Sequence, residues 1–220
     1  MKNGINFLPL MIFLWVIFAF GYLEANAQNY FPFGPQTNVP VATVTDGGWT
    51  ECYRDLYDNA MDASTVLSDC PENLLMLSCR ETGSSTLTLL AQGERSDVTF
   101  DTGDNNDVTH IANGVGWYFN TPGTDSWGFV RAGDTVEKDN CDTDGSGAND
   151  ERLCWHLQGF GGYRCGATQS LNSSVDFERI VYTNSLSRPI PTLSEWGLIA
   201  MAGVLGVVGL LVMRRRKVTA

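Results

Sequence analysis

The chain has 220 residues, with 25 acidic and 14 basic side chains, so that its formal net charge at pH 7 is −11. Its middle part, residues 28–189, holds nine basic and 23 acidic residues, which leaves a formal charge of −14. A surface this acidic repels polyanions, so we expect no nucleic-acid partner. The length suits one domain with additional segments at its ends.

The first 27 residues are a predicted signal peptide. Lys2 precedes an apolar run over residues 7–22, and Ala25 and Ala27 are the small residues of an A-x-A cleavage site. We therefore expect an exported protein whose mature chain begins at Gln28. An uncleaved membrane anchor is the alternative.

The exported part is predicted to be all-β, with a sandwich-like fold. Residues 28–44 are rich in proline and glycine, which predicts an extended lead-in. In residues 45–185, short apolar runs alternate with turns rich in Gly, Asp, Asn and Pro, a pattern typical of β-sandwiches and barrels. One short helix is expected at 58–67. The expected strands are 50–57, 74–80, 85–91, 97–100, 115–120, 127–131, 153–157, 162–165 and 177–183.

All six cysteines lie in this exported part, and an even number of cysteines in an exported chain indicates disulfides, here three. Zinc is the alternative, but the sequence has no C-x-x-C pair and neither histidine lies at ligand spacing. Six cysteines allow fifteen connectivities, among which the sequence does not decide. The pairing that we expect is Cys52 with Cys70, Cys79 with Cys165, and Cys141 with Cys154.

The stretch 140–151 is the best candidate for a metal site, with calcium as the cofactor. It follows the calcium-loop pattern, in which oxygen ligands alternate along a turn and Gly145 permits the sharp bend. A solvated acidic loop is the alternative, because no amphipathic helices flank the stretch. A second acidic turn, residues 101–107, is a weaker candidate. The predicted calcium ligands are Asn140, Asp142, Asp144 and Glu151.

Aromatic side chains offer a candidate binding surface, because an exposed ring can stack on a sugar. In the expected strand 115–120, alternation sends Trp117 and Phe119 to one face and Tyr118 to the other. Tyr118 is therefore the predicted ligand-binding residue, with a glycan as its partner. The alternative for each aromatic residue is a place in the core.

Catalytic motifs are missing from the sequence, so we expect no catalytic residue and a protein that is not an enzyme. There are two histidines, His110 and His156, and no G-x-S-x-G, H-E-x-x-H or phosphate-binding loop. His156 is expected to be structural. A secreted hydrolase that acts on polysaccharide through paired carboxylates is the alternative.

The last predicted element is one transmembrane helix over residues 196–213. This segment carries no charge, and as a helix it would span about 27 Å, close to the thickness of a bilayer core. Basic residues follow directly and belong on the cytoplasmic side, so the preceding chain faces outward. A buried core helix is the alternative. The basic tail consists of Arg214, Arg215, Arg216 and Lys217.

Residues 186–220 thus form a connector, a short motif, an apolar helix and a basic end. The motif consists of Ile190, Pro191, Thr192, Leu193, Trp196 and Gly197. This tail resembles the IPTL-CTERM protein-sorting signal, one of the exosortase-type tripartite tails. The resemblance implies a Gram-negative source, an intermediate in the inner membrane, and a membrane-embedded exosortase-type transpeptidase as partner. Cleavage near the motif would transfer the domain to the cell surface or the extracellular space. A plain membrane anchor is the alternative.

These features together predict a protein of the cell envelope or extracellular matrix that is sorted by its C-terminal tail. The exported domain is expected to be adhesive or glycan-binding.

Overall fold

The computed structural model describes residues 29–185, except 105–106, 124, 140, 143–144 and 158–160, together with residue 205. The chain divides into two compact units, Met1–Ser185 and Leu186–Ala220. The predicted signal peptide, sorting motif and basic tail lie outside the described residues, as does all but one residue of the predicted transmembrane helix. Among the described residues, no helix is long and apolar enough to cross a membrane.

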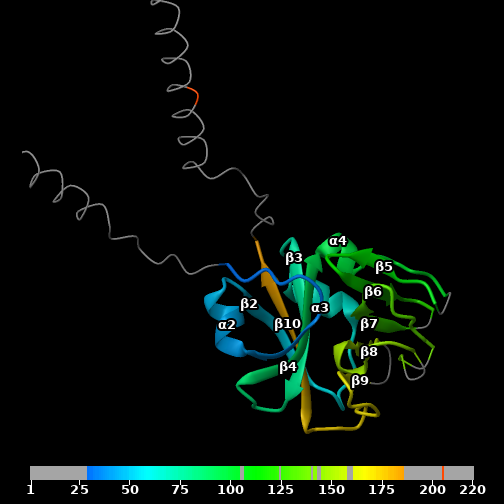
Figure 1. Cartoon of the computed structure of the whole chain (residues 1–220). Coiled ribbons are helices and arrows are strands. Elements are labelled where there is room, and N and C mark those ends of the chain that lie inside the picture. The colour runs from blue at the N-terminus through cyan, green and yellow to red at the C-terminus, as the bar shows by residue number, and fades with distance from the viewer. Residues whose placement is uncertain are drawn as a thin grey trace, which may run out of the picture. The chain divides into compact units, whose positions relative to one another are not determined.

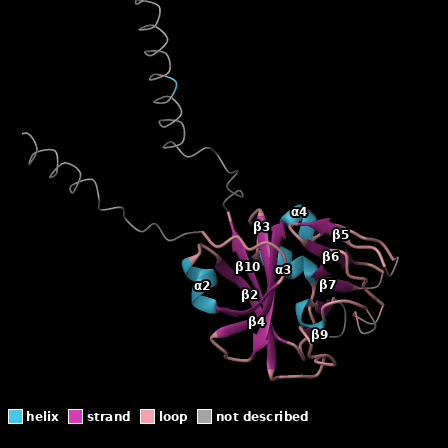
Figure 2. Ribbon diagram, in the orientation of Figure 1, coloured by secondary structure: helices cyan, strands magenta, loops and turns pink. Residues whose placement is uncertain are grey.

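The first unit contains two antiparallel sheets of five strands each (Figure 1, Figure 2). Sheet A has the strand order β1-β4-β3-β10-β2, so that strands from both ends of the unit lie side by side. Its strands, in this order, are Gln36–Pro40, Thr86–Glu94, Leu74–Glu81, Phe177–Asn184 and Thr50–Leu56.

Sheet B has its strands in chain order, β5-β6-β7-β8-β9, so each strand pairs with its neighbour in sequence. Such a meander follows from short connections between most consecutive strands, while the longer connection from β7 to β8 spans residues 132–152. Its strands are His110–Ala112, Val115–Asn120, Ser126–Arg131, Leu153–His156 and Gly162–Cys165.

The main core lies between the two sheets. Sheet A contributes aliphatic side chains such as Leu75 and Val181, and sheet B contributes three tryptophans, Trp117, Trp127 and Trp155. The rings of Trp127 and Trp155 meet edge to face with their centroids 5.9 Å apart. The core alternative for the aromatic residues is therefore right for these three side chains, and the all-β prediction is confirmed as a mostly β structure with few helices.

The lead-in differs from its prediction, because residues 28–44 contribute strand β1 and most of helix α2, Val41–Asp46. Val39 and Val44 are buried against the outer face of sheet A. Pro40 ends β1 without cost, because β1 is an edge strand and one side of its backbone needs no partner. The proline-rich composition of residues 28–44 gave no sign that this segment packs on sheet A.

Helices also replace part of the expected pattern elsewhere. Residues 97–100 were expected to be a strand, but Arg95–Val98 form helix α4, in which Val98 is buried. Its carbonyl accepts a hydrogen bond of 3.0 Å from Trp127 Nε1, which ties this single turn to sheet B. The helix expected at 58–67 begins later, as α3 over Ala63–Asp69, because Asp62 caps it with a bond of 2.9 Å from the Ser64 N–H.

Three disulfides form, with the pairing that was expected. Cys52–Cys70 joins β2 to the end of α3, Cys79–Cys165 joins the two sheets, and Cys141–Cys154 joins a loop to β8. Their Cα–Cα distances of 5.2, 5.8 and 5.4 Å are within the usual range for disulfides. The second pair closes the longest loop and therefore constrains the unfolded chain most.

Candidate functional site

Tyr118, the residue predicted to bind a ligand at the surface, is fully buried. The alternation was right, since Trp117 faces the core between the sheets and Tyr118 faces the other way. That second face is covered by the loop after β7, where Val136 and Cys141 pack on the ring. The hydroxyl donates a hydrogen bond of 2.8 Å to the Leu153 carbonyl. Tyr118 is thus structural, because both faces of this strand are covered.

In the stretch 140–151, an arginine is bound at the centre of the loop. Arg152 is fully buried, and its Nη1 donates to both carboxylate oxygens of Asp142 at 2.7 Å. Its Nη2 donates to the carbonyls of Thr135, at 2.9 Å, and Ser146. Gly145 leaves the room for this arrangement, because a Cβ there would lie 2.0 Å from Asp142 Oδ1.

The predicted calcium ligands are not brought together among the described residues. Glu151 accepts a bond of 2.6 Å from Arg131 Nε, and Asn140 and Asp144 lie outside the described residues. Within the part of the chain that the structure describes, no group of three or more His, Cys, Asp or Glu side chains could hold a metal ion. Calcium binding stays a prediction.

The second acidic turn, residues 101–107, also lies beside a cation of the chain itself. Lys138 is buried, and its Nζ donates to Gly103 O at 2.8 Å and to Thr102 Oγ1 at 3.2 Å. Burial lowers the pKa of the Lys138 ammonium, while the charges of Asp104 and Asp101 raise it. Bonds from the Gly103 N–H and the Asn120 amide lower the pKa of Asp101. Each of the two acidic loops therefore lies beside a buried cation of the chain itself, Arg152 at residues 140–151 and Lys138 at residues 101–107.

The histidines take part in packing. His156 is half-buried and meets Tyr163 edge to face at 5.7 Å, and burial lowers the pKa of its imidazole. His110 Nε2 lies 2.8 Å from Asp97 Oδ1, and its ring stacks on Phe100 with centroids 4.3 Å apart. The expectation of a structural role for His156 agrees with these surroundings.

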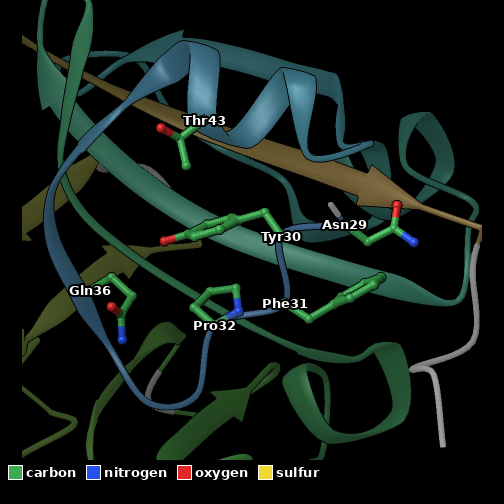
Figure 3. A pocket seen from close by; sticks show the side chains of 6 residues that line it. All are labelled: Asn29, Tyr30, Phe31, Pro32, Gln36 and Thr43. Atoms are coloured by element: carbon green, nitrogen blue, oxygen red, sulfur yellow. The ribbon is translucent and has the colours of Figure 1, made fainter. Parts of the chain in front are cut away.

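A groove of about 420 Å³ lies beside the N-terminal segment (Figure 3). Tyr30 crosses it between Thr43 of helix α2 and Gln36 of strand β1, and its hydroxyl lies at the same end as the Thr43 hydroxyl and the Gln36 amide (Figure 3). Sequence reasoning missed this site because the lead-in was not expected to pack on the domain. The available signal was the aromatic sequence NYFPF directly after the predicted cleavage site. The lining residues are Asn29, Tyr30, Phe31, Pro32, Gln36 and Thr43.

Main-chain bonds hold the aromatic wall of the groove in place. The Tyr30 N–H donates to Gly47 O at 3.1 Å, and the Tyr30 carbonyl accepts from Trp49 Nε1 at 2.6 Å. Gly47 is needed for this approach, because a Cβ there would lie 2.3 Å from the Cβ of Tyr30. Phe31 turns away and meets Trp49 edge to face at 6.1 Å. The N–H and the carbonyl of Tyr30 are thus both hydrogen-bonded, which fixes the backbone position from which its ring extends.

Comparison with known families identifies the tail. Residues 188–216 match the family model of the IPTL-CTERM motif. The chain carries an IPTL-CTERM tail. The match includes the six motif residues predicted from Ile190 to Gly197 and three of the four basic residues, Arg214, Arg215 and Arg216. The IPTL-CTERM tail and the disulfides indicate an exported protein with a C-terminal sorting signal. No curated protein and no solved structure matches the chain.

Proposed function

We propose that this protein is a surface-displayed binding protein of a Gram-negative bacterium. Its N-terminal leader and its C-terminal tail direct it to the surface. The leader is removed after Ala27, and the helix over residues 196–213 holds the chain in the inner membrane. An exosortase-type transpeptidase then cleaves near the IPTL motif and transfers the domain to the cell surface or beyond. The observation that carries this proposal is the IPTL-CTERM motif at residues 188–216.

The chemistry of the tail supports processing. An enzyme embedded in the membrane needs an extended peptide just outside the bilayer. Pro191 disfavours a helical backbone at Ile190, and Pro189 does the same at Arg188, so we expect an extended peptide there. The apolar helix after Trp196 sets the height of the motif above the membrane, and the basic end fixes its orientation.

The domain is proposed to be non-enzymatic, with an adhesive or glycan-binding role. Among its described residues, the two buried carboxylates are each bound by an arginine, Asp142 by Arg152 and Glu178 by Arg80 at 2.5 Å. A carboxylate held this way stabilises the fold and is closed to a substrate. A polysaccharide hydrolase would instead cleave the glycans that it binds. A reducing-end assay on any such glycan detects this cleavage.

The processing step is tested by substituting Pro191 by Ala in the native cells, with Ser187→Ala as a control outside the matched residues. We expect the P191A protein to be exported with its disulfides formed but to accumulate in the inner membrane with its basic tail. The S187A protein should be processed like the wild type. If P191A and wild-type protein have the same mass and location, the motif does not direct processing.

A further inference from the structure

The groove beside the N-terminal segment offers a ligand site on the exported domain. Its volume of about 420 Å³ is in the range of small-molecule pockets, about 300–1,000 Å³. Its lining combines the ring of Tyr30 with Phe31 and Pro32 and with the polar residues Asn29, Gln36 and Thr43. Apolar walls with a few polar groups are the usual composition of a binding site.

The polar groups of the groove are suited to hydroxyls. Nε2 of Gln36 donates to the carbonyls of Phe33, Gly34 and Pro35, at 2.9 to 3.3 Å, so it is held in the turn that it closes. The Gln36 amide lies at the end of the groove where the hydroxyls of Tyr30 and Thr43 lie (Figure 3), and its oxygen is an acceptor. A tyrosine hydroxyl is protonated at neutral pH, and burial raises the pKa of Tyr30 further above its ordinary value. Two hydroxyls and one acceptor complement ligand groups that both donate and accept.

The charge of the groove indicates a neutral ligand. None of its lining residues carries a formal charge, although the chain as a whole has a net charge of −11. The field of an acidic protein repels anionic ligands, no lysine or arginine lines the groove to offset it, and the proposed mature chain adds only the α-ammonium of Gln28, next to Asn29 in sequence. A sugar ring presents an apolar C–H face to an aromatic wall and hydroxyls to the polar groups around it.

The site is held rigid before any ligand binds. The carbonyl of Pro32 accepts bonds of 2.9 Å from Gln92 on β4 and from Asn113 in the turn between β5 and β6. Tyr30 is anchored to Gly47 and Trp49 as described above. A preformed site loses little ordering entropy on binding, which favours recognition of a small ligand.

We propose that this groove binds a neutral saccharide, with Tyr30 stacking on the sugar ring and Thr43 and Gln36 binding its hydroxyls. This inference rests on the proposed function, because it names the ligand of the displayed domain. Affinity for a short oligosaccharide is on the order of 10⁻⁴–10⁻³ M, since few hydrogen bonds form in an open groove.

The test uses the full chain in a detergent without a sugar headgroup, because a glycosidic detergent would compete for the groove. Neutral oligosaccharides of hexose and N-acetylhexosamine, and uronate-containing oligosaccharides, are screened on an array, and the best neutral binder is titrated by ligand-observed NMR. Thr43→Ala and Tyr30→Phe each remove one hydroxyl and should weaken binding about threefold to tenfold. Tyr30→Ala, which also removes the ring, should weaken it more than tenfold.

The matched control is Thr45→Ala on the same helix, which should bind like the wild type because Thr45 does not line the groove. Thermal midpoints of all variants are measured, and T43A and Y30F are expected to keep the wild-type value. The inference is overturned if only acidic glycans bind, if no neutral glycan binds, or if T43A and Y30F bind like T45A. Loss of the tail is measured separately, by the mass of protein from native cells. Binding by the full chain together with an intact tail in native cells would contradict the sorting proposal alone, and loss of the tail there without saccharide binding would contradict the saccharide site alone.

Discussion

The outer faces of the two sheets are covered in different ways. Sheet A is covered by the lead-in and α2, and the cluster between them is apolar, with Val44, Trp49 and Ile180 among its members. Sheet B is covered by the loop after β7, which is held by a disulfide and by the buried ions of Arg152 and Asp142. Apolar contacts tolerate small losses, whereas a buried ion without its partner is costly. A single substitution in the cover of sheet B should therefore lower the free energy of unfolding strongly. A single substitution in the cover of sheet A should lower it only slightly.

The largest effect is expected at Arg152. Replacing it by Met keeps the volume but removes the guanidinium that binds both Asp142 oxygens, and leaves Arg164 Nη1, 3.7 Å from Asp142 Oδ2, as the remaining buried cation at the carboxylate. The free energy of unfolding should fall by about 3–5 kcal/mol, which urea unfolding of the full chain measures. Asp142→Asn together with R152M removes both charges but leaves Arg164 buried without this carboxylate, so it should recover only part of the loss. A single R152M variant as stable as the wild type would show that the ion pair does not hold the loop.

A smaller effect is expected on the other sheet, at Ile180. Replacing this buried residue by Val removes one methylene from the apolar cluster, which should cost about 0.5–1.5 kcal/mol in the same urea experiment. If the two covers differ in this way, I180V should lower the free energy of unfolding clearly less than R152M does. Equal losses at both positions would remove the distinction between an apolar and an ionic cover.

The strands of sheet B were the most predictable part of the fold. Strands β6 and β9 have the bounds expected from their alternating apolar patterns and from the glycine-rich turns beside them. Strand β5, with three residues, is too short to give a periodic pattern, and it forms only because β6 pairs with it. Strand β1 was hidden by its prolines, since the burial of Val39 depends on a sheet assembled from distant strands.

The candidate sites were less predictable than the strands. Of the carboxylates in the calcium-loop pattern, Asp142 does bind a cation, but that cation is Arg152, which directly follows the pattern in sequence. Tyr118 was assigned to the correct face, yet a local pattern does not reveal that a later loop covers that face. The groove at Tyr30 depends on contacts with Gly47 and Trp49, so the lead-in gains its function only in the assembled domain.

A weaker effect concerns pH and the outer side of sheet B, where His156 packs on Tyr163. Burial lowers the pKa of His156, so the unfolded chain binds a proton at a higher pH than the folded one does. The free energy of unfolding should therefore decrease as the pH falls below about 6.5, toward the folded-state pKa. His156→Gln should flatten this slope between about pH 6.5 and 5.5 in urea titrations. An unchanged slope would mean that His156 does not contribute.

The smallest effect is expected from calcium. With Arg152 bound to Asp142, the loop has its own cation, so the thermal midpoint should be the same in millimolar calcium and in chelator. A calcium site would instead raise the free energy of unfolding by about 2.7 kcal/mol at a hundredfold excess over the dissociation constant. An increase that disappears in Asp144→Ala would confirm calcium binding at this loop.

The intact mass of the wild-type protein released from native cells tests the central proposal most directly. We expect a chain that begins at Gln28, has no free thiol and lacks the basic tail, because both ends are removed during delivery to the surface. A mass that still includes residues 213–220 would contradict processing at the IPTL-CTERM tail and would identify the tail as a plain membrane anchor.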